Sequence, residues 1–352
     1  MPHVRNAWYV AGWSIDLEPG KPFALSILDE PIVMFRTVAG RIAALEDRCL
    51  HRLAPLSLGR CEGENLRCMY HGLLFDPAGQ CIEIPGQEMI PARARVRSYP
   101  IVARHGWLWV WMGDPAKADE ALIPDVIGHD HPDWIMGRGQ QDWAADAALV
   151  NNNLLDFSHL PFVHAASFGV SEVYAHSQPK LTMLDRGVRV DRWFEDSIGP
   201  VGGVGEARLD HWLTYDLIVP GILLNYSGMY PAGTAKACNH ERPDYAKAVA
   251  SVSFTSQSVT PMTARSTRYH YCWGPHRDHG DEALRDALIG IQAMAFAEDR
   301  MMIEAQQRII DLGGTGQDMP TAHDRTVLAY QRVVERLAEA EQAAARPTQR
   351  RD

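Results

Sequence analysis

The sequence predicts an α+β protein of two domains, and three observations support this. Residues 1 to about 113 show strand patterns without helical periodicity, residues 180–275 return to strands with frequent Gly and Pro, and the chain from residue 281 onward is helical. Because strands and helices fall in separate blocks and do not alternate, a parallel β–α–β sheet is disfavoured. A polar stretch rich in Asp and Pro begins at residue 113, so we predict domains over 1–113 and 114–352.

The first domain is expected to be small, antiparallel and all-β. Residues 31–46 predict a hairpin that turns at Gly40, and residues 66–84 predict a second hairpin that turns at Asp76-Pro77-Ala78-Gly79. Residues 105–113 alternate in the manner of a further strand.

The second domain is expected to contain three helical segments around its strands. Residues 142–169 have a helical pattern that Pro161 interrupts. A long helix is predicted over 281–312, where Gly313 and Gly314 end it, and another over 322–346.

Composition excludes several classes of function. Apolar residues make up 46% of the chain and charged residues 22%, which is typical of a folded globular protein. The net charge of −10 argues against binding to nucleic acid or to an anionic membrane. No apolar run reaches about 18 residues, so no membrane span is expected. The N-terminus lacks a signal-peptide pattern and six cysteines in so long a chain do not suggest a disulfide scaffold, so we expect a cytoplasmic protein.

Two Cys–His pairs lie close together in the first domain. Cys49 and His51 are separated by one residue, Cys68 and His71 by two, and sixteen residues lie between the pairs. A structural zinc site is one interpretation, but residues two apart in an extended chain are about 7 Å apart and chelate one ion poorly. A two-iron cluster fits better, because each pair then gives its Cys to one iron and its His to the other. This is the ligation of a Rieske [2Fe–2S] centre.

A second cluster of possible ligands lies within residues 142–169. Asp156 and His159 are three apart and share a helix face. His164 would point about 140° away from His159 on a regular helix, but Pro161 must bend the chain and could bring the imidazoles together. Two His and one carboxylate with open positions form the site of non-heme Fe(II) oxygenases. The alternative is an ordinary helix with satisfied polar side chains.

The carboxylate is expected from the long C-terminal helix. Asp299 lies about 20° from Leu288 on the helical wheel, within an apolar stripe, where a carboxylate is costly unless it is paired or binds a metal. Glu298 lies on the rim and is the weaker candidate. From the pattern alone, Asp299 is either the third ligand or a salt-bridged core residue. The stripe is expected to comprise Leu284, Leu288, Ile291, Ala295, Met302 and Ile309.

With these motifs the chain resembles the oxygenase (alpha) subunits of Rieske non-heme iron oxygenases. C-x-H with C-x2-H, D-x2-H-x4-H and "FAEDRMMIEAQQ" match the family's ligand segments, and "NAWYVAGW", "APLSLGR" and "WVWMGDPA" are most similar to the vanillate O-demethylase and toluenesulfonate methyl-monooxygenase type. The resemblance implies a helix-grip (START-like) catalytic domain after the Rieske domain. It also implies one [2Fe–2S] cluster and one Fe(II) per subunit, the latter on His159, His164 and Asp299.

The resemblance further implies how the two centres communicate. Asp156 would bridge His71 of one subunit and His159 of its neighbour, which requires a closed oligomer, expected to be a homotrimer. Asn153 is assigned with Asp156 to catalysis. Electrons would come from NAD(P)H through a separate reductase of the flavin and ferredoxin type. Asn152 stands where the family often has an acid, which predicts a less charged surrounding of the iron.

The activity implied is oxidation of a methyl group by O2 on a methoxylated or methylated aromatic acid. An aryl methyl ether would yield a hemiacetal that collapses to a phenol and formaldehyde. The alternative enzyme is an aromatic ring hydroxylase or cis-dihydroxylase with the same two centres, and a Rieske electron carrier with a ligand-binding domain is the alternative from another class. Substrate contacts are suggested at Asn225, Gln257 and Gly290, each with a purely structural explanation beside it.

Overall fold

The computed structural model describes residues 2–165, 167, 179–197, 208–313 and 319–345. These residues form two compact units, one of Arg5–Ile123 with Thr260–Ala264, and one mainly of Pro124–Val259 and Arg265–Asp352. The predicted functional boundary at residue 113 stays a prediction, while the compact units divide after Ile123.

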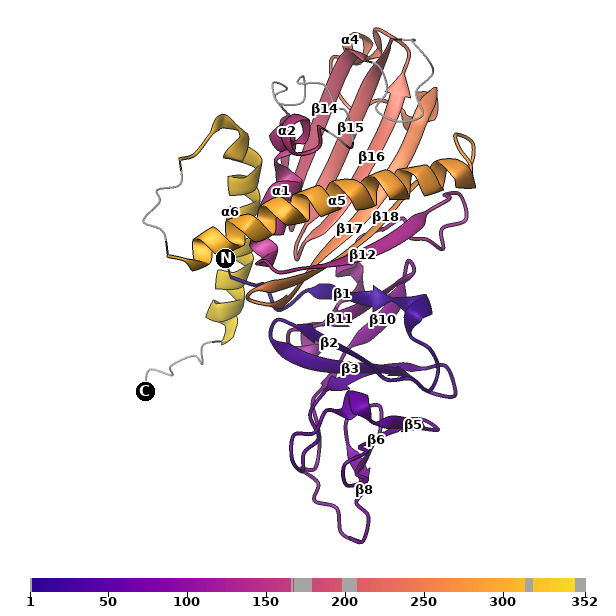
Figure 1. Ribbon diagram of the computed structural model, residues 1–352, viewed down its shortest axis with the longest axis vertical. Coiled ribbons are helices and arrows are strands. Elements are labelled where there is room, and N and C mark those ends of the chain that lie inside the picture. The colour runs from indigo at the N-terminus through magenta and orange to yellow at the C-terminus, as the bar shows by residue number, and fades with distance from the viewer. Residues whose placement is uncertain (1, 166, 168–178, 198–207, 314–318, 346–352) are drawn as a thin grey trace. The chain divides into compact units, whose positions relative to one another are not determined.

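The first unit consists of small antiparallel sheets (Figure 1). The sheets are β1 (Trp8–Trp13), β11 (Trp107–Trp111) and β10 (Ile101–Arg104); β2 (Phe23–Ile27), β3 (Glu30–Arg36), β4 (Ile42–Glu46) and β9 (Ser98–Tyr99); and β5 (Arg60–Glu62), β6 (Asn65–Arg67), β7 (Leu74–Phe75) and β8 (Cys81–Glu83). Its short 3-10 turns are Ser14–Asp16, Leu56–Leu58, Pro115–Lys117 and Glu120–Leu122. Most neighbouring strands are joined by short hairpins, whereas β1 pairs with β11 and β4 with β9 across long stretches of the chain.

Both predicted hairpins of this unit are present. β3 and β4 pair across a turn in which Gly40 has φ +84°. The second turn is closed by Asp76, whose Oδ1 accepts hydrogen bonds from the backbone N–H groups of Ala78 (2.9 Å) and Gln80 (2.8 Å). Gly79 adopts φ +83°, and a Cβ there would lie 2.3 Å from the carbonyl oxygen of Val96. The turn therefore requires glycine both for its backbone conformation and for space.

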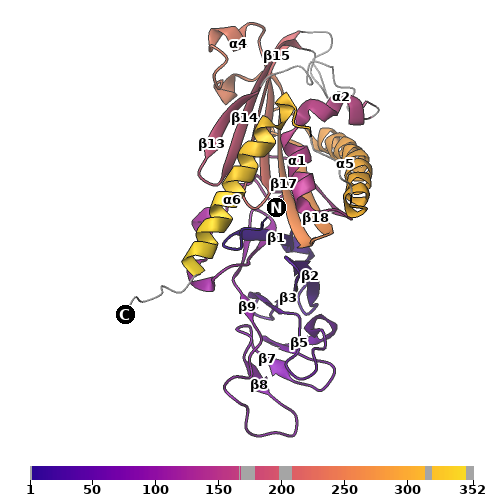
Figure 2. The same cartoon turned by 90° about the vertical axis from the view of Figure 1, so that its left-hand side faces the viewer.

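The second unit is built on a seven-stranded antiparallel sheet with helices on it, the α+β helix-grip arrangement expected. The long helix α5 (Glu282–Asp311) crosses one face of the sheet (Figure 1), and α6 (Arg325–Ala345) lies along β14 (Figure 2). The sheet order is β12 (Gly137–Trp143), β18 (Ser266–Pro275), β17 (Ala250–Thr263), β16 (Ile222–Tyr230), β15 (Leu209–Ile218), β14 (Gly187–Ser197) and β13 (Lys180–Leu184). Shorter elements are α1 (Ala147–Leu155), α2 (Leu160–Val163), α4 (Thr234–Ala237) and 3-10 turns at Phe157–His159, Tyr245–Lys247 and Ala322–Asp324.

The helical segment predicted over 142–169 differs from the prediction in two ways. It begins only at Ala147, because residues up to Trp143 belong to β12, and Asp146 caps it by accepting a hydrogen bond from Ala148 N–H (2.8 Å). The chain bends at Asp156 (φ −112°, ψ 92°) and not at Pro161. Pro161 lies in the first turn of α2, where backbone N–H groups have no acceptor within the helix. The N–H that proline lacks therefore costs no hydrogen bond here, and the predicted role for this proline was wrong.

The apolar stripe predicted on α5 is only partly present. Leu288 and Ala295 are buried, but Met302 is 53% and Ile309 65% exposed, so the stripe was wrong at its C-terminal end. Polar side chains lie on the buried face of α5 instead, and a pattern of apolar residues in the sequence cannot predict their burial. The buried residues are Leu288, Gln292, Ala295, Phe296, Asp299, Ile303 and Gln307. None of the helices that the structure describes is both long and apolar enough to span a membrane.

Candidate redox and iron sites

Two loops of the first unit hold the Cys–His pairs, and their backbones are alike. In the first loop, Cys49 N–H donates to the carbonyl oxygen of Ala54 (2.8 Å) and Cys49 O accepts from Leu53 N–H (3.0 Å). Cys68 makes the same two hydrogen bonds to the residues at the same offsets (2.8 and 3.0 Å). Each cysteine is therefore positioned by its own backbone before any ligand binds.

In each loop, the residue four positions after the cysteine adopts the left-handed backbone conformation. Gly72 supplies it in the second loop with φ +79°, and a Cβ on Gly72 would approach Pro85 Cγ to 2.8 Å. In the first loop the same position is Leu53, with φ +57° and an exposed side chain. A non-glycine residue in this region carries strain of about 1–2 kcal/mol.

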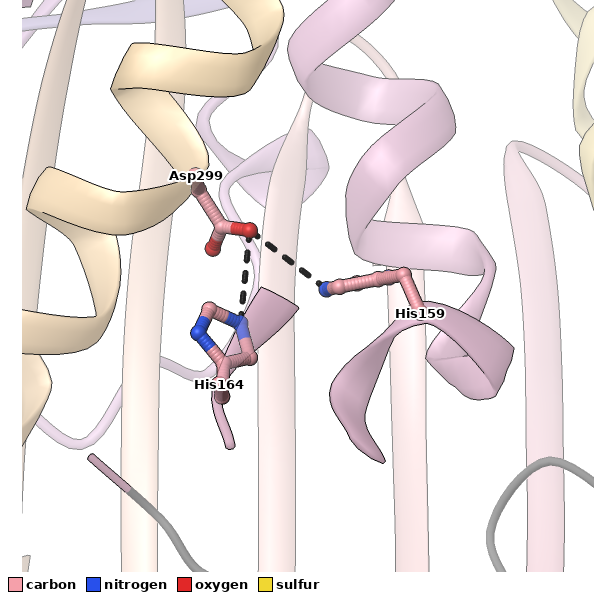
Figure 3. A group of neighbouring side chains, drawn as sticks. All are labelled: His159, His164 and Asp299. Carbon is pink, nitrogen blue, oxygen red and sulfur yellow. Dashed lines mark ion pairs between the residues drawn. The ribbon is translucent and has the colours of Figure 1, made fainter. Parts of the chain in front are cut away.

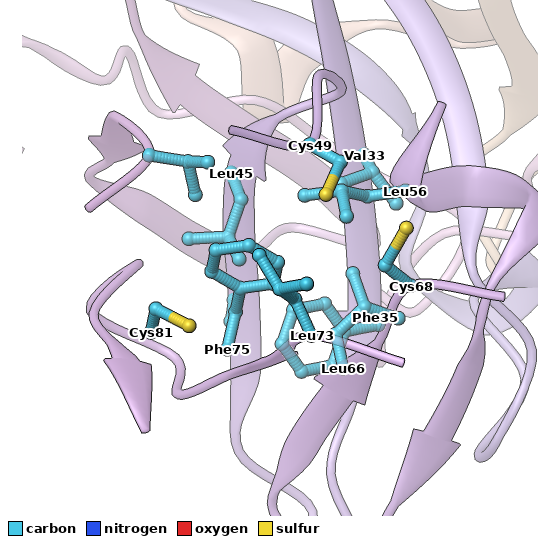
Figure 4. Packing of buried hydrophobic residues seen from close by; sticks show 12 residues of the cluster. Val33, Phe35, Leu45, Cys49, Leu56, Leu66, Cys68, Leu73, Phe75 and Cys81 are labelled. Carbon is cyan, nitrogen blue, oxygen red and sulfur yellow. The ribbon is translucent and has the colours of Figure 1, made fainter. Parts of the chain in front are cut away.

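The donor atoms divide into an inner and an outer pair. Cys49 and Cys68 are each 1% exposed within a cluster of buried apolar residues, where Figure 4 shows Cys81 apart from both. Burial, with the neighbouring Cys68 thiol, raises the pKa of Cys49 to about 11. The exposed rings of His51 and His71 lie side by side, with centroids 4.3 Å apart. Two buried thiols and two outer imidazoles suit the split ligation of a [2Fe–2S] cluster, which would hold the thiols as thiolates.

The second unit brings His159, His164 and Asp299 to one point (Figure 3). Asp299 Oδ1 lies 3.5 Å from His159 Nε2 and 3.3 Å from His164 Nε2. With metal–ligand bonds of about 2.1 Å, ligands at right angles are roughly 3 Å apart, so these separations suit a metal held on one face by two imidazoles and a carboxylate. His164 and Asp299 are buried, and His159 is half-buried.

Hydrogen bonds at the far ring nitrogens orient both imidazoles. His159 Nδ1 donates to the backbone oxygen of Asp156, and His164 Nδ1 donates to Glu298 Oε2 (2.8 Å), which also accepts from Ser167 Oγ (2.6 Å). Each ring thus presents an unprotonated Nε2 to the shared point, as a metal ligand must. Burial lowers the pKa of His159; for His164 burial also acts to lower the pKa, but the hydrogen bonds to Asp299 and Glu298 outweigh it and raise the pKa.

The neighbouring candidates Asn153, Asp156 and Glu298 each make a hydrogen bond to the ligand group. Asn153 Nδ2 donates to Asp299 Oδ1 (3.1 Å) and lies 3.4 Å from His159 Nε2, so it contacts the ligand group directly. The carboxylate of Asp156 does not contact His159 within the chain: its Oδ1 accepts from Ser158 N–H (2.8 Å), and the backbone oxygen holds the ring. Glu298, considered as a weaker ligand, instead orients His164.

The surroundings of Asn152 also differ from the expectation. Asn152 accepts a hydrogen bond from Gln331 of α6 (3.4 Å) and so links two helices. It is not part of the hydrogen bonds around the iron ligands that the structure describes. Its identity therefore does not set the charge around the metal, and the acid that is present there, Glu298, comes from α5.

The iron ligands open onto a cavity of about 170 Å³ between the sheet and helices α1, α2 and α5. Most of its walls are apolar, with Leu213, Leu223, Trp273, Leu288 and Phe296 among them. The polar side chains on the sheet strands are neutral at pH 7 and comprise His211, Asn225, Ser227, Ser251, Ser253, Thr255 and Gln257. Such a cavity suits a flat apolar ligand with a few polar substituents.

Two of the three suggested substrate contacts line this cavity. The Oδ1 atom of Asn225 is buried without a hydrogen-bond partner among the described residues. Gln257 Oε1 accepts from the hydroxyl of Tyr269. Gly290 was a wrong suggestion: it is exposed on α5, outside the cavity, and a Cβ there would meet no atom within 4 Å.

Sequence reasoning missed His211 and Gln292. His211 and Leu213 alternate along β15, which predicts a shared face but not that this face lines a cavity. Gln292 lies four residues after Leu288 and seven before Asp299, a helical spacing that places it on their face, but the signal lay on a polar residue.

Comparisons with known proteins agree with both sites. Residues 7–100 match the Rieske [2Fe-2S] domain, and residues 143–340 match the vanillate O-demethylase oxygenase C-terminal domain. The chain is 37% identical to the iron-sulfur subunit of the toluene-4-sulfonate monooxygenase system of Comamonas testosteroni, over 98% of this chain and 99% of that protein. It is 33% identical to a vanillate O-demethylase oxygenase subunit of a Pseudomonas species, over 97% and 96% of the two chains.

Solved structures extend the likeness to the fold. The crystal structure of dicamba monooxygenase bound to 3,6-dichlorosalicylic acid superposes with a TM-score of 0.86 at 29% identity, covering 98% of this chain and all of that one. The form with non-heme iron and dicamba gives a TM-score of 0.80 at 27% identity, with the same coverage. The chain therefore belongs to the Rieske non-heme iron oxygenases of the vanillate O-demethylase type, and it is the oxygenase component of a multicomponent monooxygenase with one [2Fe–2S] cluster and one Fe(II).

Proposed function

We propose that this oxygenase oxidises the methyl group of a methoxylated or methylated aromatic acid, and that a methyl ether is thereby converted to a phenol and formaldehyde. The observation that supports this most directly is that His159, His164 and Asp299 open onto a mostly apolar cavity. The balanced reaction is ArOCH3 + O2 + NAD(P)H + H⁺ → ArOH + HCHO + H2O + NAD(P)⁺. Relatives are named O-demethylases for vanillate and for dicamba, which favours methyl oxidation over ring hydroxylation.

The chain's own residues position the metal and the substrate. When bound, the cluster supplies electrons and Fe(II) supplies the activation of O2. His159, His164 and Asp299 would hold the iron, and Asn153 fixes the oxygen of Asp299 that both imidazoles face. The apolar walls exclude water around the methyl group, and Asn225 offers an amide to a polar substituent of the ring.

Labelled substrates test the proposal. Purified protein, a surrogate reductase and NADH are incubated with a panel of [methyl-13C]methoxybenzoates, and formaldehyde and phenol are measured by NMR. The expected result is one labelled formaldehyde per phenol and per O2 consumed. The matched control is the His159→Ala variant, which should release none. Ring-oxygenated product with the methyl group retained would contradict the proposal and favour a ring hydroxylase or cis-dihydroxylase.

We further propose the assembly in which this component works. In a homotrimer, Asp156 would connect His71 of one subunit with His159 of its neighbour, and an NAD(P)H-dependent reductase of the flavin and ferredoxin type would deliver electrons in the cytoplasm. The support is local: the backbone oxygen of Asp156 holds the His159 ring, and the carboxylate is half-buried with one oxygen on Ser158 N–H. The division into a Rieske domain (1–113) and a catalytic domain (114–352) belongs to the same proposal.

The assembly is tested by mass and by electron transfer. Sedimentation should give three times the chain mass of 39.3 kDa. The Asp156→Asn variant should retain its cluster and its Fe(II), yet its prereduced cluster should reoxidise far more slowly with substrate and O2 than in the wild type. A monomer with full activity would contradict the proposed path.

A further inference from the structure

His211 is an imidazole on the cavity wall that the iron site does not use. It lies on β15 and is 2% exposed. Its Nε2 hydrogen bonds Ser227 Oγ on β16 (2.8 Å), and its Nδ1 has no hydrogen-bond partner among the described residues. The ring is therefore held from one side, with one nitrogen available to a ligand.

The charge of the cavity makes this ring unusual. Among the described residues that line the cavity there is no Lys or Arg. Asp299, His159 and His164 are the iron ligands, which leaves His211 as the one remaining lining group that can gain a positive charge. A buried carboxylate or sulfonate without a compensating charge is strongly disfavoured.

In the part of the chain that the structure describes, the elements packed against His211 bring no charge to it. Phe194 of β14 faces it with ring centroids 5.6 Å apart, and Met229 of β16 is its partner across the sheet. The nearest carboxylate along the chain, Asp210, accepts hydrogen bonds from the backbone N–H groups of Asp196 (3.2 Å) and Ala235 (2.9 Å). Burial alone lowers the pKa of His211 to about 4, so the ring is neutral in the free enzyme at pH 7.

We propose that His211, oriented by Ser227, is the specificity-determining residue that binds the acidic group of the aromatic substrate and takes up one proton from solvent as it does so. The step is ArCO2⁻ + H⁺ + His211 → ArCO2⁻···His211-H⁺, with no change in oxidation state. An anion placed against the ring favours its charged form, so the bound pKa rises above the free one. Between these two pKa values, binding of the anion weakens about tenfold for each unit of rising pH. The inference rests on the proposed aromatic-acid substrate.

Calorimetry of the oxidised holoenzyme tests the proposal without turnover. Binding of 4-methoxybenzoate, toluene-4-sulfonate and the neutral 4-methoxybenzamide is measured in two buffers of different ionisation enthalpy, which counts protons. The wild type should take up about one proton with either anion and none with the amide. The His211→Asn variant should lose this uptake and bind the anions at least about tenfold more weakly, with little change for the amide. The exposed His279→Asn variant is the matched control and should behave as wild type.

Other results overturn the proposal. Anion binding without proton uptake, uptake that persists in His211→Asn, or no binding of either anion would each do so. If the asparagine variant does not fold, Ser227→Ala, which keeps the imidazole but removes its partner, should still take up the proton while binding the anions more weakly. The outcome is separable from demethylation: proton-coupled binding with no formaldehyde release would support His211 and contradict the proposed reaction.

Discussion

The two metal sites of this protein are built in opposite ways. The proposed cluster ligands lie within residues 49–71, on two loops whose cysteines make the same backbone hydrogen bonds. The proposed iron ligands are residues 159, 164 and 299, and side chains from two helical regions, Asn153 and Glu298, hold them in place. The cluster site is thus determined by local chain geometry, whereas the iron site depends on how α5 packs against the sheet.

This contrast implies that the sites can be lost separately. The backbone hydrogen bonds of the two cysteine loops are made within each loop, so loss of a side chain on α5 should leave them in place. It also implies different sensitivities: the loops should respond to changes of backbone conformation, and the iron site to changes of a single hydrogen bond. The following predictions test these points in order of decreasing effect.

Removal of one ligand from each site should have the largest effect. His159→Ala should lose the mononuclear iron and all oxygenase activity while the visible absorption of the cluster remains. Cys68→Ser should bleach the cluster and abolish activity while the isolated chain still binds added Fe(II). Iron analysis should therefore fall from about three irons per chain to about two in the first variant and about one in the second.

Cys61→Ser is the control for the cysteine change, because Cys61 is partly exposed on β5 and is not one of the four cluster ligands. It should retain both metals. Loss of both iron pools in His159→Ala would show that the sites are coupled and that the contrast drawn above is mistaken.

Weakening of one supporting hydrogen bond should have an intermediate effect. Glu298→Gln leaves an amide where the carboxylate accepts from His164 Nδ1 and Ser167 Oγ. Loss of the charge-assisted bond should lower Fe(II) affinity or activity by about 10–100-fold. Titration of iron-depleted protein with Fe(II) measures this, and exposed Glu335→Gln on α6 is the matched control. Unchanged affinity would mean that the ring of His164 is held by its packing.

Exchange of residues at the left-handed loop positions should shift stability in opposite directions. Gly72→Ala forces a Cβ against Pro85 at φ +79° and should destabilise the cluster loops by about 1–3 kcal/mol. Leu53→Gly removes strain at φ +57° and should stabilise them by up to about 1 kcal/mol, since the flexibility gained by the unfolded chain offsets part of the gain. Thermal bleaching of the cluster gives both values. The same sign for both changes would contradict the likeness of the two loops.

Substitution on the exposed side of α5 should have the smallest effect. Gly290→Ala adds a methyl group to open space within a helix, so it should stabilise the second unit by about 0.5–1 kcal/mol and leave kcat and KM unchanged. The reverse change at the exposed neighbour Ala287 should destabilise it by a similar amount. A change in substrate preference for Gly290→Ala would show that Gly290 lies near the bound substrate.

The sequence by itself determined the hairpins, the long helices and the candidate cluster ligands, because these depend on residues near one another in the chain. Turn residues such as Asp76 and Gly79 act through hydrogen bonds to their immediate neighbours. The pairs Cys49–His51 and Cys68–His71 carry their geometry in their spacing. Periodicity also predicted that Asp299 is buried, and left open whether it binds a metal.

Only the tertiary structure decided which buried polar groups face one another. It placed the chain bend at Asp156, exposed Met302 and Ile309, removed Gly290 from the cavity and assigned Glu298 to His164. The hydrogen bond between Glu298 and His164 joins residues 134 apart in the chain, and no local pattern specifies such a contact. The neutral wall that contains His211 arises in the same way, because it is formed only when strands and helix α5 close around one cavity.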